Sequence, residues 1–195
     1  MIKGILQSEA FYCNHLGMSD NDEKDIAAFE AVSLEGEGLV NYLRYSAFPE
    51  EDAGIMRTYM IRDNQTDELA GYFSLKAGLV SANEVIEQGK VGFDTFPGIE
   101  VANFAVNRKY IETHPYAKGC GLLFFRRFIR PIIVNVSKEV GISMIYIFAI
   151  PIDELIQRYS NYGFRRLSEA AERQIHNRIK PTYDEGCIFM YQMLR

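Results

Sequence analysis

Residues 119–125, Gly119-Cys120-Gly121-Leu122-Leu123-Phe124-Phe125, decide the fold because a glycine turn opens directly into a long apolar helix. Residues 98–107, just upstream, have the composition of a strand, so the order is strand, tight turn and helix. Such a turn points several backbone N–H groups and the positive end of the helix dipole at one place, where a phosphate group usually binds. By itself a G-x-G before a helix is most often a plain turn, so the interpretation as a phosphate-binding turn depends on the flanking segments.

Those segments predict a strand–helix–strand unit. We expect the helix to cover residues 122–140 and the next strand residues 142–149, which makes this strand a parallel neighbour of residues 98–107. Pro131 should kink the helix because it lacks a backbone donor. A further helix over residues 152–161 should end at Gly163.

The rest of the chain indicates an α+β protein. We expect helices over residues 23–32 and 39–48, a hairpin of strands 57–62 and 70–76, and a closing strand over 186–193. Residues 80–96 match no pattern and are interpreted as an insertion. The prediction is one domain, residues 1–195, with a mixed, largely antiparallel twisted sheet and helices on both faces.

Composition narrows the class of protein. The chain has 195 residues and a formal net charge of −5, so it has no overall field that would attract nucleic acid. The three cysteines, Cys13, Cys120 and Cys187, have neither a disulfide framework nor zinc-site spacing. No secretion signal or membrane-spanning stretch is present in the sequence. We therefore expect a cytoplasmic protein without structural metal. The sequence is compatible with a monomer or a homodimer.

Five segments carry a resemblance to a known family. They are Gly98-Ile99-Glu100-Val101-Ala102-Asn103-Phe104-Ala105-Val106-Asn107, the glycine turn, Leu122-Leu123-Phe124-Phe125-Arg126-Arg127-Phe128, Met144-Ile145-Tyr146-Ile147-Phe148-Ala149 and Arg158-Tyr159-Ser160-Asn161-Tyr162-Gly163-Phe164. In this order and at this spacing they resemble the GNAT superfamily of acyl-CoA N-acyltransferases over residues 70–166. The resemblance implies an N-acetyltransferase that moves an acetyl group from acetyl-CoA, its co-substrate, to a primary amine by direct attack.

The resemblance also implies two catalytic residues. Tyr159 lies four residues before Gly163-Phe164, where the family keeps the tyrosine that protonates the leaving thiolate. Glu100 matches the general base of the histone-acetyltransferase branch. From the residues alone, Tyr159 is better explained as a core tyrosine, and Glu100 is equally well explained as a solvated strand end. Tyr162 is the rival donor.

The cofactor-binding residues follow from the same resemblance. In the family, the strand end pairs through its backbone with the pantetheine arm, and the loop binds the pyrophosphate. These positions correspond here to Phe104, Ala105 and Val106, and to Lys118, Gly119, Cys120, Gly121 and Leu122. A helix start can lower the pKa of a thiol, but a residue under a pyrophosphate is poorly placed as a nucleophile, so no catalytic role is assigned to Cys120.

The loop departs from the family pattern. Residues 107–118 are several residues longer than usual, with residues 111–115 as the expected extra piece. Tyr116 occupies the position where the family has glutamine or arginine. A phosphate nest needs only backbone groups, so we still expect CoA to bind.

The acceptor is not identified by the sequence. We expect a small-molecule or protein amine and no nucleic acid, given the acidic balance and the acidic residues Glu50, Glu51 and Asp52. An alternative is the toxin-like GNAT branch that acetylates aminoacyl-tRNA, which residues 11–13, 39–43 and 70–75 loosely resemble. A second alternative is a non-catalytic, acyl-CoA-binding regulatory protein. Arg126, Arg127 and Arg130 lie near one helix face, which could meet an anionic acceptor or the 3′-phosphate of CoA, or could simply face solvent.

Overall fold

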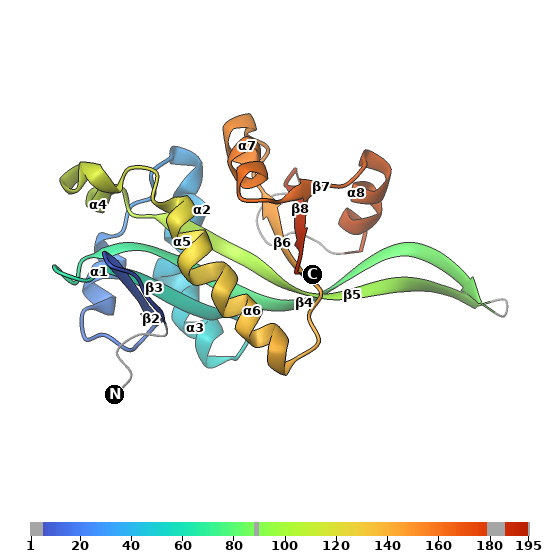
Figure 1. Cartoon of the computed structure of the whole chain (residues 1–195), viewed down its shortest axis with the longest axis horizontal. Coiled ribbons are helices and arrows are strands. Elements are labelled where there is room, and N and C mark those ends of the chain that lie inside the picture. The colour runs from blue at the N-terminus through green and yellow to red at the C-terminus, as the bar shows by residue number, and fades with distance from the viewer. Residues whose placement is uncertain (1–5, 88–89, 179–185, 195) are drawn as a thin grey trace. The chain divides into compact units, whose positions relative to one another are not determined.

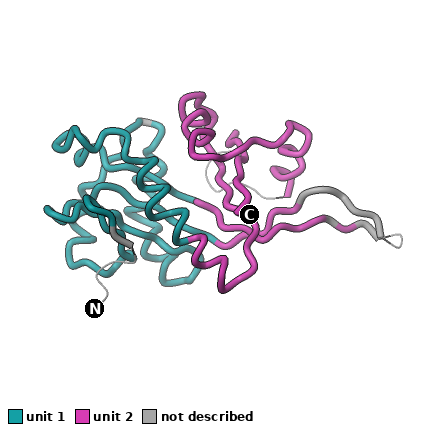
Figure 2. Tube along the Cα trace, in the orientation of Figure 1, with its two compact units in different colours: residues 1–76, 102–132 teal, residues 77–101, 133–195 magenta. Residues whose placement is uncertain are grey.

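The structure is a computed structural model that describes residues 6–87, 90–178 and 186–194 (Figure 1). The chain divides into two compact units (Figure 2). Unit 1 contains residues 1–76 and 102–132, and unit 2 contains residues 77–101 and 133–195. The expectation of one domain over residues 1–195 stays a prediction.

Unit 1 is built on strands in the order β1-β2-β3-β4-β5. They are β1 (Leu6–Gln7), β2 (Phe11–His15), β3 (Arg57–Asp63) and parts of β4 (Leu69–Glu87) and β5 (Lys90–Val106). β3 and β4 form the predicted antiparallel hairpin, with Tyr59 opposite Phe73 and Met60 opposite Tyr72. Because side chains alternate along a strand, these two pairs lie on opposite faces of the sheet.

Helices cover both faces of this sheet, as predicted. On the Met60 face lie α1 (Asp22–Ala28), η1 (Leu34–Gly36), α2 (Glu37–Asn41), the π-helical turn η2 (Tyr42–Ser46) and α3 (Ala47–Asp52). Ile26 and Leu43 from these helices join Met60 in one buried core. On the other face, α5 (Gly121–Phe124) packs the ring of Phe124 5.0 Å from that of Phe11.

The long helix after the glycine turn contains a wider turn. α5 continues into the π-helical η4 (Phe125–Ile129) and then into α6 (Arg130–Glu139). The N–H of Arg130 donates to the carbonyl of Phe125, five residues earlier instead of four. Pro131 follows directly. Proline has no backbone N–H to donate, and a wider turn is one way in which a helix adapts to that missing hydrogen bond. The kink itself stays a prediction.

Unit 2 confirms the predicted parallel pair. Its strands follow the order β5-β6-β8-β7, with β6 at Met144–Ala149, β7 at Arg165–Arg166 and β8 at Ile188–Met193. β5 and β6 are parallel, with Gly98 opposite Met144 and Glu100 opposite Tyr146, whereas β8 is antiparallel to both β6 and β7. The sheet is therefore mixed and largely antiparallel, as the sequence predicts.

The helices of unit 2 end and pack as follows. α7 (Asp153–Asn161) is followed by Gly163, whose φ of +97° is the left-handed conformation expected at a helix stop. α8 (Glu169–His176) contributes Ile175 to a core with Tyr146 and Phe189. No helix in the described part of the chain is long and apolar enough to cross a bilayer.

Residues 80–96 form no separate element. The segment interpreted as an insertion instead belongs to two long strands, as the last part of β4 and the first part of β5. Its two described ends are not solvated, because Val80 is buried and Phe96 packs against the same core of unit 2.

Candidate functional site

The glycine turn has the backbone geometry of an anion-binding loop. Gly119 adopts a φ of +84°, which glycine tolerates best, and Gly121 is the first residue of α5. Cys120 donates its N–H to the carbonyl of Ala117 at 3.0 Å. Within the described residues, the N–H groups of Gly119, Gly121 and Leu122 have no hydrogen-bond partner, as expected at a helix start. The turn therefore offers three free backbone donors.

The two side chains of this turn differ in environment. Lys118 is exposed, which leaves its ammonium group available to an anion. Cys120 is buried, and burial raises the pKa of its thiol to about 12. The low-pKa setting that a helix start can give a thiol is therefore absent, because burial outweighs the helix dipole. Cys120 stays protonated at neutral pH.

The structure brings the end of β5 and the start of α5 together within unit 1. Ala105 is buried while Phe104 and Val106 are half-buried, so the strand alternates up to its end. Gly71 of β4 lies between the two elements. A Cβ on Gly71 would come within 2.7 Å of the Ala105 carbonyl oxygen and 3.2 Å of the Phe124 ring. Glycine at this position permits the close approach.

The long loop of residues 107–118 folds into two short helical elements. α4 covers Arg108–Thr113, and the 3₁₀ turn η3 covers Pro115–Ala117. The side chain of Asn107 caps α4 by accepting a hydrogen bond from the N–H of Lys109 at 3.2 Å. Residues 111–115, the expected extra piece, span the end of α4 and the start of η3. Tyr116 is 70% exposed.

Tyr159, in unit 2, lies on α7 and is half-buried. Its ring makes edge contacts with Tyr162 and Phe164, at centroid distances of 5.8 and 5.9 Å. Burial, followed by the influence of Tyr162, raises the pKa of Tyr159 to about 12. The phenol therefore keeps its proton at neutral pH, which a proton donor requires.

Glu100, also in unit 2, lies on β5 and is half-buried. The hydroxyl of Tyr146 on β6 is hydrogen-bonded to its carboxylate, and burial followed by the charge of Glu100 raises the pKa of Tyr146. Tyr146 itself is buried against two glycines. A Cβ on Gly78 would come within 1.8 Å of the Tyr146 hydroxyl oxygen, and one on Gly98 within 3.0 Å of its ring. Glu100 thus has a hydrogen-bond partner on the neighbouring strand.

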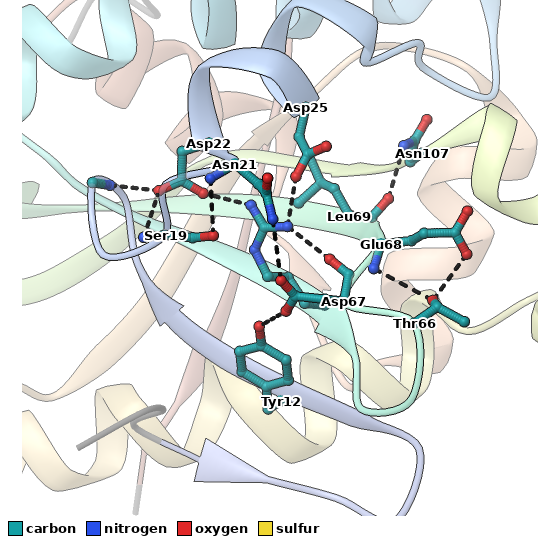
Figure 3. A network of polar contacts seen from close by, with 12 residues as sticks. Tyr12, Ser19, Asn21, Asp22, Asp25, Thr66, Asp67, Glu68, Leu69 and Asn107 are labelled. Atoms are coloured by element: carbon teal, nitrogen blue, oxygen red, sulfur yellow. Dashed lines mark hydrogen bonds and ion pairs between the residues drawn. The ribbon is translucent and has the colours of Figure 1, made fainter. Parts of the chain in front are cut away.

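A buried ion-pair cluster in unit 1 escaped the sequence analysis (Figure 3). Arg62 on β3 is fully buried and pairs with Asp22 at 2.5 Å and with Asp25 at 2.6 Å, both on α1. Arg62 also donates to the carbonyl of Asp67 at 2.8 Å, and the side chain of Asp67 accepts from the hydroxyl of Tyr12. No motif marks these residues, because they are scattered over the sequence.

Among the residues that the structure describes, no group of three or more His, Cys, Asp or Glu side chains is placed to hold a metal ion. The three cysteines are free and buried.

The sequence matches no family model. Its structure, however, is similar to solved structures of toxin acetyltransferases. A tyrosine-to-phenylalanine variant of KacT has a TM-score of 0.64 at 16% identity, covering 95% of this chain and 95% of that chain. The chain has the GNAT fold.

Two structures of AtaT show the same similarity in different complexes. AtaT complexed with acetyl-methionyl-tRNAfMet has a TM-score of 0.61 at 17% identity, covering 92% of this chain and 93% of that one. A tyrosine-to-phenylalanine variant of the AtaT toxin, bound to the C-terminus of the antitoxin AtaR and to acetyl-CoA, has a TM-score of 0.59 at 15% identity. That comparison covers 94% of this chain and 92% of the other.

Proposed function

We propose that the chain is an acetyl-CoA-dependent N-acetyltransferase whose acceptor is the amino group of an aminoacyl-tRNA. One observation carries the proposal: the fold matches AtaT over nearly the whole of both chains, and AtaT has been solved with acetyl-methionyl-tRNAfMet. The tRNA alternative is therefore favoured over an unidentified small-molecule or protein amine. Our expectation that nucleic acid is no partner has no support from these comparisons.

The glycine turn supports acetyl-CoA as the acetyl donor. Gly119, Gly121 and Leu122 offer free N–H groups for a pyrophosphate, and Lys118 adds a positive charge beside them. The backbone at the end of β5, from Phe104 to Val106, would pair with the pantetheine arm. The complex of AtaT with acetyl-CoA supports the same assignment by analogy of fold.

The proposed reaction is a direct transfer. The acceptor nitrogen attacks the thioester carbonyl, the C–S bond breaks, and the nitrogen loses a proton as the sulfur gains one. Tyr159 is the proposed donor of the proton to the sulfur, consistent with its retained proton and with the tyrosine variants made in KacT and AtaT. Glu100, whose carboxylate is hydrogen-bonded to Tyr146, is proposed to take the proton of the amine through water.

Local charge supports a tRNA acceptor better than the net charge does. Arg126 and Arg127 are exposed on the helix that follows the glycine turn. Neither they nor Lys118 form an ion pair with another described residue. By contrast, Arg108 and Lys109 on α4 are both paired with Glu30. Cations without a protein partner near the glycine turn can bind phosphates even in an acidic protein.

The test is an acetyl-transfer assay with matched acceptors. Thiol release from acetyl-CoA is measured with aminoacyl-tRNA, with the same tRNA lacking its amino acid, and with a library of small amines and peptides. We expect release with aminoacyl-tRNA alone, and an apparent affinity that falls steeply as salt rises. Transfer to a simple amine but not to aminoacyl-tRNA would restore the small-molecule or protein acceptor. Binding of acetyl-CoA with no transfer to any acceptor would favour the non-catalytic alternative.

The basic helix face gives a sharper version of this test. Replacing Arg126 and Arg127 with alanine should weaken tRNA binding and flatten its salt dependence, since each lost phosphate contact lowers the slope of log K against log salt by about 0.7–0.9. The control is Arg173→Ala, which removes an exposed arginine paired with Glu169 on α8. Equal salt slopes in both variants would show that this face does not contact the acceptor.

A further inference from the structure

The segment between β5 and the glycine turn is tied to the end of β3. This segment, α4 and η3, lies in the loop of residues 107–118 and contains residues 111–115, the expected extra piece. A longer loop has more conformations to lose when its end is fixed. The free N–H groups of the turn can converge on one phosphate only if the turn is held in place, so the loop needs an anchor.

Asp63, the last residue of β3, supplies the first contact. Its carboxylate is buried, with the residue 4% exposed. One carboxylate oxygen accepts hydrogen bonds from the hydroxyl of Tyr110 at 2.5 Å and from that of Tyr116 at 3.3 Å. The other accepts from the N–H groups of Gln65 at 2.7 Å and Thr66 at 3.2 Å. Although burial acts to raise the pKa of Asp63, these hydrogen bonds outweigh it and lower the pKa.

His114 supplies the second contact. Its ring stacks on that of Tyr110 with centroids 4.3 Å apart, and its Nε2 lies 3.4 Å from a carboxylate oxygen of Glu68 in the β3–β4 turn. The carbonyl of His114 then accepts from the N–H of Ala117 at 2.9 Å, and the carbonyl of Ala117 accepts from the N–H of Cys120 at 3.0 Å. A continuous chain of contacts therefore runs from the β3–β4 turn to the glycine turn, entirely within unit 1.

We propose that Asp63 is a positioning residue, which holds the glycine turn in its anion-binding geometry through the buried hydroxyl of Tyr110. This inference rests on the proposed function, because the ligand of the turn that Asp63 positions is taken to be the pyrophosphate of acetyl-CoA. Tyr110 is 2% exposed and is the third residue of α4, so the hydrogen bond fixes the first turn of that helix. Tyr116 is exposed and adds a longer, weaker contact to the same oxygen.

The same turn offers a matched control. Asp67 accepts a hydrogen bond from the hydroxyl of Tyr12 on β2, just as Asp63 at the other end of the turn accepts one from Tyr110. Tyr12 lies on strand β2, and its hydrogen bond to Asp67 involves neither α4 nor η3. Tyr110→Phe and Tyr12→Phe each delete one hydroxyl and keep the ring. Only the first should loosen the glycine turn.

Two measurements on the full-length protein test this difference. The first is the Kd of CoA by calorimetry, together with KM and kcat for acetyl-CoA. We expect Tyr110→Phe to raise Kd and KM about tenfold, which is the size of effect expected when one binding contact is lost. The kcat at saturation should stay within about twofold of wild type. Tyr12→Phe should leave all three near wild type. The second measurement is hydrogen exchange of residues 114–121, which should be about tenfold faster in Tyr110→Phe alone.

The outcomes separate this inference from the proposed function. If both variants lose the same thermal stability and neither changes Kd or exchange in residues 114–121, the anchor is overturned and the hydrogen bond is merely structural. If the wild-type protein binds no CoA, the proposed function fails, and exchange in residues 114–121 still decides whether Asp63 and Tyr110 hold the turn. A second variant, Asp63→Asn, should reproduce the faster exchange, because a neutral amide accepts a weaker hydrogen bond from Tyr110.

Discussion

Replacing Arg62 with methionine should destabilise unit 1 far more than the loss of an ordinary ion pair. The Arg62 side chain is 0% exposed, and that of its partner Asp22 is 2% exposed. Methionine fills much of the same volume but cannot donate. The Asp22 carboxylate would then keep only the N–H groups of Gly17 at 2.7 Å and Ser19 at 3.4 Å. A buried charge that loses its counter-charge is the costly part of this change.

The expected magnitude follows from these burial values. Breaking a buried ion pair by removing one partner costs about 3–5 kcal/mol, against a total stability of about 5–15 kcal/mol. With a urea dependence of about 2 kcal/mol per molar, the unfolding midpoint should fall by roughly 1.5–2.5 M. Urea titrations followed by far-ultraviolet circular dichroism at pH 7 measure this shift.

Two further variants show whether the reasoning is right. Arg173→Met breaks an exposed pair with Glu169, whose side chains are 72% and 90% exposed, and should cost less than about 1 kcal/mol. Adding Asp22→Asn to Arg62→Met should recover part of the loss, because an amide is cheaper to bury than a carboxylate. A midpoint shift in Arg62→Met no larger than in Arg173→Met would refute the argument. A double variant no more stable than the single one would show that the Asp22 charge is not the cause.

Three other predictions concern the candidate site. Tyr159→Phe should lower the single-turnover rate of acetyl transfer about a hundredfold with little change in CoA affinity; an unchanged rate would remove Tyr159 from the mechanism and favour Tyr162. Gly121→Glu should weaken CoA binding by roughly a thousandfold in calorimetry, by bulk and repulsion, whereas Gly38→Glu, where a Cβ meets nothing within 4 Å, should bind normally. The thiol of Cys120, with its pKa raised to about 12, should react with iodoacetamide at pH 8 far more slowly than a free thiol. Because the unfolded thiol ionises near pH 9, stability should also fall as pH rises from about 9 towards 12, and fast alkylation of the native protein would contradict both expectations.

Local sequence signals predict elements well where one physical cause dominates. The glycine turn, the parallel pair of β5 and β6 and the stop at Gly163 each depend on a backbone conformation or on a periodic apolar pattern. The hairpin of β3 and β4 is predicted for the same reason. The extended parts of β4 and β5 are not, because their residues lack the alternation that a buried face imposes.

Side-chain networks are harder to predict, because their members are distant in sequence. Arg62 meets Asp22 across 40 positions, and Asp63 meets Tyr110 across 47. Neither pair has a spacing that a helix or strand period would create. The environment of Cys120 was missed for a related reason, since burial depends on what packs over a residue and not on its place at a helix start.

The two networks also explain each other's position. Arg62 and Asp63 are neighbours at the end of β3, and consecutive strand residues point to opposite faces of a sheet. Arg62 is therefore bound to α1, and Asp63 to Tyr110 of α4. The turn that follows is bound from both directions, since Asp67 accepts from Tyr12 and Glu68 lies beside His114. Asp67 holds a φ of +63°, the left-handed conformation that aspartate tolerates better than most residues and that suits a tight turn. The β3–β4 turn is thus a rigid support, and a rigid support is what a long loop needs if its far end is to present backbone donors to a phosphate.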